Sequence, residues 1–242
     1  MKTSEFKLGI RDGLPICLGY LAVSFSFGIL AIQSGLSVLE ATLISLTNLT
    51  SAGQLAAVPI IAGGGLLLEL ALAQLVINLR YALMSLTLSQ KFDGSVKLRH
   101  RFLIAFGNTD EIFAVSVSKP HNVSRWYMYG LIITPLIGWV SGTLVGALIG
   151  EVLPLDIVLS LQLAIYGMFI AIVVPAAKCD KSVLLCVLIA VALSCAFYYI
   201  PVLNTIPSGF TIIICAVVAS AIMAIVRPIK HGVKEDKDDD KA

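Results

Sequence analysis

The chain has 242 residues, of which 58% are hydrophobic and 13% charged, and its mean hydropathy is +0.94. This composition excludes a soluble globular domain, and the net charge of +2 comes with no basic patch that would bind nucleic acid. Apolar runs of about 20 residues, long enough to cross a lipid bilayer, repeat along the sequence. The sequence therefore predicts an all-α, polytopic helical membrane protein.

Both ends of the chain are polar. Residues 1–13 mix positive and negative charges, and we expect a cytoplasmic N-terminal segment there. The apolar run that follows is a full span without an obvious cleavage site, so it does not have the layout of a removable signal peptide. The tail, 227–242, is rich in lysine and aspartate and is expected to be disordered and cytoplasmic. Between them, residues 14–226 form the expected transmembrane transport domain.

The first expected span covers residues 14–33, and the next apolar stretch, 36–62, contains a polar interruption at 45–54. Gly53 is expected to break the helix there. In lipid, a broken polar segment has to be buried in protein or line a cavity, and transporters place substrate sites in such segments. The alternative is a polar face that packs against a neighbouring helix.

A third apolar stretch runs from residue 66 to 88 and is followed by a basic connection at 91–101. Residues 102–118 are apolar but contain Asn108, Thr109, Asp110 and Glu111, which predicts a second broken or half-inserted segment. After the basic residues of 119–125, four cleaner spans are expected, at 126–149, 157–177, 182–200 and 208–226.

Basic residues orient membrane proteins, because short loops rich in lysine and arginine stay in the cytoplasm. They gather at the N-terminus, at 91–101, at 119–125, at Lys178 and Lys181, and after Arg227. With all of these in the cytoplasm, both termini are cytoplasmic, about six helices cross fully, and 36–62 and 102–118 are broken or re-entrant. If both segments cross, there are eight spans and the basic loop 91–101 lies outside.

Charged side chains inside apolar spans are expensive and are candidates for function. Arg80 lies well inside the third stretch, and Glu69 is eleven residues earlier on the same helical face. Gln74 and Asn78 are four residues apart and share another face. The alternative role for Arg80 is a structural anchor that pairs with a carboxylate or reaches the interface through its long side chain.

Asp110 and Glu111 are adjacent, so on a helix they point about 100° apart and are expected to have different partners. One of them is expected to pair with Arg80, while the other faces water, cycles between charged and neutral forms and carries a proton. The alternative is that both carboxylates cap or flank a half-helix at the cytoplasmic surface.

Motifs for catalysis are missing, since the sequence has no Gly-x-Ser-x-Gly elbow, P-loop or His-Glu-x-x-His. The spacing of the five cysteines predicts neither a disulfide framework nor a metal site. The three histidines fall in polar connections. We therefore expect no enzyme activity, no metal and no cofactor.

Four fragments in this order, Gly13-Leu-Pro15, Ser51-Ala-Gly-Gln54, Asn78-Leu-Arg80 and Thr109-Asp-Glu111, together resemble the AzlC family over about residues 6–226. That family is the large subunit of bacterial two-component exporters of branched-chain amino acids. Two departures bear on the substrate more than on the family. Tyr81 follows the arginine where the family often has histidine, and the stretch before Gln54 is more polar than usual.

The resemblance implies proton-coupled antiport that exports leucine, isoleucine, valine and, in some members, methionine, through the bacterial cytoplasmic (inner) membrane. It also implies a small membrane partner of the AzlD type. Two alternatives stay open, a permease for another small solute and a non-transporting membrane scaffold. We predict that Asp110 and Glu111 couple the proton, and that the substrate is bound by Ser51, Gly53, Gln54, Asn78 and Arg80.

Overall fold

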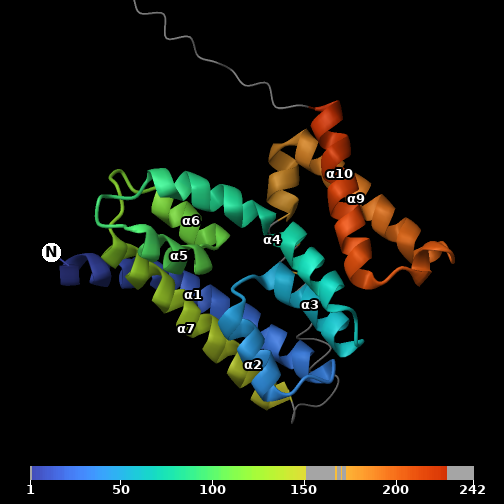
Figure 1. Cartoon of the computed structure of the whole chain (residues 1–242), viewed down its shortest axis with the longest axis horizontal. Coiled ribbons are helices and arrows are strands. Elements are labelled where there is room, and N and C mark those ends of the chain that lie inside the picture. Colours follow the sequence, from blue (N-terminus) through green and yellow to red (C-terminus); the bar gives the residue numbers. More distant parts are fainter. Residues whose placement is uncertain (1, 151–166, 168–169, 171–172, 228–242) are drawn as a thin grey trace, which may run out of the picture.

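The computed structural model describes residues 2–150, 167, 170 and 173–227. This part of the chain is helical and has no named β-strand (Figure 1). The named elements are α1 (Lys2–Gln33), α2 (Val38–Thr47), α3 (Ser51–Ala62), α4 (Leu67–Gln90), α5 (Leu98–Phe106), α6 (Asp110–Val117), α7 (Arg125–Gly150), α9 (Lys181–Tyr199), the short 3₁₀ helix η1 (Leu203–Thr205) and α10 (Ser208–Val226).

Five of these helices, α1, α4, α7, α9 and α10, are long and apolar enough to cross a membrane. They correspond to five of the six expected crossings, and the all-α polytopic class is confirmed. The sixth expected span, 157–177, lies largely outside the described residues, as does the tail beyond Arg227. The expected N-terminal segment is helical from Lys2 and forms the first turns of α1.

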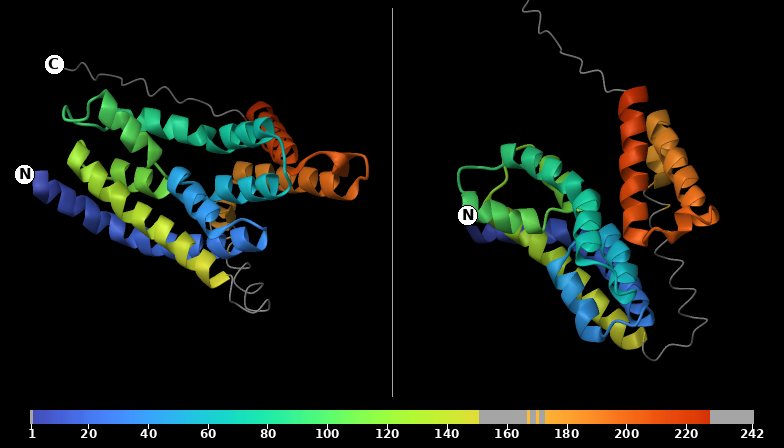
Figure 2. Two further views of the ribbon diagram at one scale, coloured as in Figure 1. Left: turned by 60° about the horizontal axis from the view of Figure 1, so that its bottom comes forward. Right: turned by 45° about the vertical axis from the view of Figure 1, so that its right-hand side comes forward.

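The most extensive contact joins α1 and α7, which run side by side in the same direction (Figure 2). Small residues make this possible, because α7 carries Gly138, Gly142, Gly146 and Gly150 at every fourth position. A Cβ atom added to Gly146 would overlap the carbonyl oxygen of Phe25 on α1. The two backbones therefore touch directly, as small residues allow between helices in membranes.

Both predicted interruptions are present. The stretch 36–62 forms α2 and α3, separated by residues 48–50, and the segment 102–118 falls in α5 and α6, separated by residues 107–109. The position predicted for the first break was wrong, because Gly53 lies inside the first turn of α3. The physical reason is the cap. Thr50 has extended backbone angles, and its side chain accepts a hydrogen bond from the Gly53 N–H, so the new helix begins directly after Thr50.

The order of a long helix, a short helix, a break and a second short helix occurs twice, in α1–α2–α3 and in α4–α5–α6. Both second short helices have a threonine N-cap, Thr50 for α3 and Thr109 for α6, whose side chain accepts from the backbone N–H three residues later. We call α2–α3 the first hairpin and α5–α6 the second hairpin, and their breaks the tips.

The two hairpins enter the molecule from opposite ends. At one end, Asp12 of α1 pairs with Lys119 at 2.6 Å, and the Asp93 N–H donates to the Val123 carbonyl. This end holds both connections of the second hairpin and much of the basic charge. At the other end, next to the connections of the first hairpin, Glu69 Oε1 accepts from the Gly209 N–H at 2.8 Å and joins α4 to α10.

The backbone contact between α1 and α7 predicts that Gly→Ala substitutions at two positions change the stability of the protein by different amounts. Gly146→Ala should destabilise the protein by about 1–3 kcal/mol because its methyl group has no space. Gly19→Ala is the matched control, since nothing lies within 4 Å of a Cβ at that position of α1. The thermal unfolding midpoints of the two variants are measured in detergent, with size-exclusion chromatography to monitor the loss of folded protein. Equal midpoints would contradict this packing.

The two ends of the molecule also predict membrane sidedness. In a cysteine-free background, Lys97→Cys lies in the basic connection before α5, and Thr205→Cys lies in the uncharged connection before α10. An impermeant maleimide added to intact cells should label position 205 only, and both positions after permeabilisation. Labelling of position 97 in intact cells would instead support the arrangement with eight spans.

Candidate functional site

Gln74 of α4 is the centre of a polar network at the first tip. Its side-chain Nε2 donates to the Gly53 carbonyl at 2.8 Å. Its Oε1 accepts from Asn78 Nδ2 at 3.1 Å and from Asn48 Nδ2 at 3.3 Å. A single amide thus holds the chain before the break, the helix after it, and the neighbouring turn of α4.

Gly53 is required by this network rather than by helix breaking. A Cβ at position 53 would lie 2.5 Å from Gln74 Oε1 and 2.6 Å from Thr50 Cγ2. Both atoms are held in place, one by the amide network and the other by the cap. Glycine therefore lets α4 approach the first turn of α3 closely enough for Gln74 to reach the backbone.

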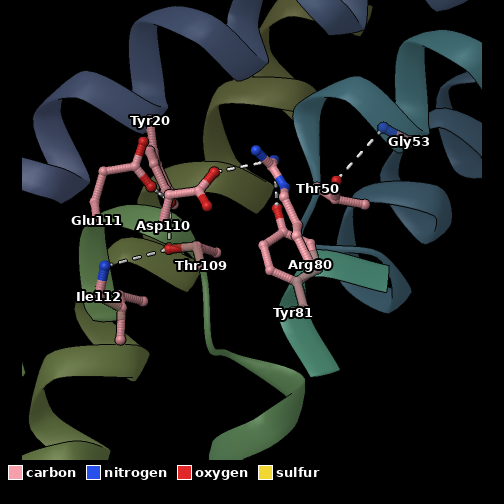
Figure 3. Close-up of polar contacts among 9 residues, drawn as sticks. All are labelled: Tyr20, Thr50, Gly53, Arg80, Tyr81, Thr109, Asp110, Glu111 and Ile112. Atoms are coloured by element: carbon pink, nitrogen blue, oxygen red, sulfur yellow. Dashed lines mark hydrogen bonds and ion pairs between the residues drawn. The ribbon is translucent and has the colours of Figure 1, made fainter. Parts of the chain in front are cut away.

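Arg80 and Asp110 form an ion pair between α4 and the start of α6, with Nη2 and Oδ2 2.9 Å apart (Figure 3). The Arg80 guanidinium also lies over the Tyr81 ring, 4.9 Å from its centroid, and donates to the Tyr81 hydroxyl at 3.2 Å. Both side chains of the pair are about half exposed, at 49% and 48%. The described residues therefore do not enclose the pair.

Glu111 has a different partner, as expected for adjacent carboxylates on a helix. The Tyr20 hydroxyl of α1 lies 2.5 Å from Glu111 Oε2 and 2.6 Å from Thr109 Oγ1 (Figure 3). Thr109 is also the N-cap of α6, and its side chain accepts from the Ile112 N–H. Tyr20 therefore ties the second tip to α1, while Arg80 ties it to α4.

Gln54 is fully buried, and its Nε2 donates to Ser45 Oγ at 2.8 Å. Ser45 Oγ is in turn 2.6 Å from Thr143 Oγ1 of α7. This chain of contacts fixes the first hairpin to α7. In this conformation Gln54 has no exposed atom to offer a substrate. Ser51 lies beside Gln54 in a small apolar gap closed by Phe27 and Trp139.

A cavity of about 140 Å³ lies where the two tips meet. It is lined by residues 47–50 of the first tip, by Asn78 and Tyr81 of α4, and by Ala105, Phe106 and Asn108 around the second tip. We call it the polar cavity. Since one buried water needs about 10–15 Å³, this space can hold several waters or a small polar group.

A second cavity of about 330 Å³, the apolar cavity, lies between α4 and α5. Its walls include Leu86, Phe102 and Ile104, and it shares Ala105 and Asn108 with the polar cavity. The two cavities therefore adjoin at the second tip. Together they combine three amide side chains and the N-terminus of α3 with an aliphatic and aromatic wall.

The structure thus brings together most of the predicted site residues. Gly53 and Asn78 both contact Gln74, and Arg80 pairs with Asp110. Glu111, the next residue in α6, contacts Tyr20 of α1. Ser51 and Gln54 point elsewhere, and Glu69 is buried at the far end of α4 on the α10 N-terminus. Among the described residues, no group of three His, Cys, Asp or Glu side chains is placed to hold a metal ion.

Sequence reasoning did not assign site roles to Tyr20, Asn48, Gln74 or Asn108. Gln74 carried a signal, its spacing of four from Asn78, and Asn108 stands directly before the predicted carboxylates. Tyr20 carried none, because a single tyrosine in an apolar span looks like any interface residue. Its partners are about 90 residues away in the chain, at separations of 89 and 91.

Comparison with known proteins agrees with this architecture. The model of the AzlC protein family matches residues 15–153. A membrane protein of Archaeoglobus fulgidus is 35% identical over 179 residues, which is 73% of this chain and 78% of that protein. The inner membrane protein YgaZ of Escherichia coli is 32% identical over 153 residues, 62% of each chain. A membrane protein of Helicobacter pylori is 28% identical over 154 residues, 61% of this chain and 67% of that protein.

A search of solved structures found no significant match. The family match covers more than half of the chain and includes both hairpins, the Gln74 network and the ion pair. The relatives are named membrane proteins, and the described residues hold five helices long and apolar enough to cross a membrane, so the comparisons and the fold together support a multi-pass membrane protein of transporter type. This chain belongs to the AzlC protein family.

Proposed function

We propose that this protein is the large subunit of a two-component secondary transporter that exports branched-chain amino acids across the cytoplasmic membrane. The observation that carries the proposal is the pair of adjoining cavities at the second tip. A branched-chain amino acid is a zwitterion with an aliphatic side chain. It needs polar groups for two charges and an apolar wall next to them, and the two cavities offer both at one place.

Helices interrupted at membrane depth support the same proposal. The first turn of a helix has backbone N–H groups without intrahelical partners, and these favour anionic groups. In transporters such ends are aimed at anionic groups of the substrate. Here Thr50, the N-cap of α3, lines the polar cavity, and α6 begins two residues after Asn108, another lining residue. A carboxylate in the polar cavity would be close to the N-terminus of α3.

An exposed apolar surface supports the proposal of a small membrane partner of the AzlD type. The outward face of α4 exposes Leu75, Leu79, Leu83 and Leu86 by 59–68%. Phe102 of α5, a wall of the apolar cavity, is 71% exposed. Lipid or a second apolar subunit has to cover this surface, and a subunit there would close the apolar cavity.

Proton coupling is assigned to the Arg80–Asp110 pair, with Glu111 as its structural neighbour. A proton that binds Asp110 removes the negative charge and releases Arg80 from α6. Because the pair lies beside Tyr81, a wall of the polar cavity, protonation changes the contact between α4 and the second tip. Export follows if the binding site turns outward with the substrate bound and returns inward with Asp110 protonated.

The direct test is efflux of radiolabelled leucine from preloaded cells that express this chain together with its small partner. Export should be several times faster than in cells with the empty vector, and excess unlabelled isoleucine or valine should slow it. An uncoupler should reduce it. If efflux of leucine, isoleucine and valine is no faster than in cells with the empty vector, and another solute is exported, the alternative of a permease for another small solute is favoured.

Asp110→Asn tests the coupling. The amide keeps the shape of the carboxylate but does not titrate, so exchange of leucine down its own gradient should survive while uphill export driven by a pH gradient is lost. Proteoliposomes with an imposed pH gradient separate the two activities. Glu40→Gln, an exposed acid in α2 that caps its own helix, is the control and should leave both intact.

Two other results would count against this assignment. If Asp110→Asn still concentrates leucine in response to the pH gradient, the coupling site lies elsewhere. If Arg80 and Asp110 variants lose only the association with the small subunit, and the wild-type protein binds no substrate, the membrane scaffold alternative is favoured.

A further inference from the structure

Asn78 and Asn108 both line the polar cavity, and the buried side-chain oxygen of each, Oδ1, has no hydrogen-bond partner among the described residues. Asn108 is 3% exposed and donates its Nδ2 to Ser85 Oγ at 3.0 Å. A buried acceptor without a partner costs about 1–3 kcal/mol, so native proteins rarely keep one without a reason. Two such acceptors on one small cavity indicate a ligand or waters that donate to both.

The orientation of Asn78 follows from its neighbours. The Gly53 carbonyl only accepts, so Gln74 must direct its Nε2 to it and leave its Oε1 as an acceptor. Asn78 must then donate its Nδ2 to Gln74 Oε1. The Asn78 oxygen is thereby fixed on the side of the amide away from Gln74, and Asn78 itself lines the polar cavity.

The charge around this cavity selects the kind of donor. The nearby carboxylates are already engaged, Asp110 with Arg80 and Glu111 with Tyr20. The unpaired groups of Asn78 and Asn108 are therefore neutral oxygens, which favour a cationic donor, while the N–H groups of the α3 N-terminus at Thr50 remain for the carboxylate. A primary ammonium has three N–H donors on one atom and can bond both oxygens at once.

We propose that Asn78 and Asn108 bind the α-ammonium group of the substrate, with its aliphatic side chain in the apolar cavity. The position of Asn108 on both cavities makes this arrangement possible, because the ammonium and the side chain of an α-amino acid leave the same carbon. This inference rests on the proposed function for the identity of the amino acid, but not for the ammonium class.

Asn108→Ala tests the inference by binding rather than by export. The purified full-length chain, in lipid nanodiscs with and without the small subunit, is titrated with leucine and two analogues. The first, 3-methylbutan-1-amine, keeps the ammonium and lacks the carboxylate. The second, 4-methylpentanoate, keeps the carboxylate and lacks the ammonium. Asn122→Ala, in an exposed connection, is the matched control.

Loss of a hydrogen bond to a charged group should weaken leucine and the amine about ten- to hundredfold in Asn108→Ala, and leave 4-methylpentanoate unchanged. Asn108→Asp keeps the shape and gains a charge, so it should retain or tighten the amine and weaken the carboxylate analogue. If Asn108→Ala does not fold, the opposite changes in affinity for the two analogues in Asn108→Asp test the inference instead. Wild-type affinity for the amine in Asn108→Ala, or equal losses for both analogues, would overturn the inference.

The two proposals fail in different ways. If wild-type protein binds leucine and Asn108 variants bind it equally well, the ammonium site is wrong and the exporter proposal stands. If it binds primary amines through Asn108 but no branched-chain amino acid, the site stands and the proposed substrate is wrong. If it binds neither leucine nor any primary amine, both are wrong.

Discussion

The structure depends on one constraint, that backbone groups exposed by a helix break in lipid must find partners inside the protein. Each tip meets it with a threonine cap that accepts from a first-turn N–H, and at the first tip Gln74 also ties α4 to α3 by donating to the Gly53 carbonyl. The need for Gly53, the position of Asn78 and the close approach of α4 all follow from that bond. Removing it would take away the side-chain hydrogen bond that joins α4 to the first turn of α3.

The contact between α1 and α7 gives these tips a stable support. Two parallel helices in backbone contact cannot shift without separating many atoms, and each hairpin is attached to them by polar contacts as well as by packing. Ser45 and Gln54 attach the first hairpin to Thr143, and Tyr20 attaches the second through Thr109 and Glu111. The contact of α4 with the second hairpin is of another kind, because it is an ion pair, Arg80 with Asp110, that depends on the charge of the carboxylate. The glycine packing between α1 and α7 does not depend on charge.

The sequence predicted the elements better than their contacts. Polar residues inside the apolar runs at 45–54 and 108–111 were enough to predict two broken segments. The cost of charge in lipid predicted that Arg80 pairs with Asp110 or Glu111, and the structure shows that the partner is Asp110. The break itself was placed at Gly53 because glycine is the usual helix breaker, whereas Thr50 decided it by capping. Gln54 faces Ser45 and not the cavity, since a helical period gives relative direction but not which neighbour lies there.

Placing the ammonium on neutral amides has a consequence for coupling. If the substrate ammonium were neutralised by Asp110, the same carboxylate would have to release Arg80, bind the substrate and carry the proton. With Asn78 and Asn108 as acceptors, Asp110 keeps Arg80 as its partner and changes charge only with the proton. The two events still communicate, because Asn108 and Asp110 are two residues apart at the second tip, and Asn78 and Arg80 are two residues apart on α4. A proton that loosens the ion pair therefore shifts the elements that carry the two amide oxygens.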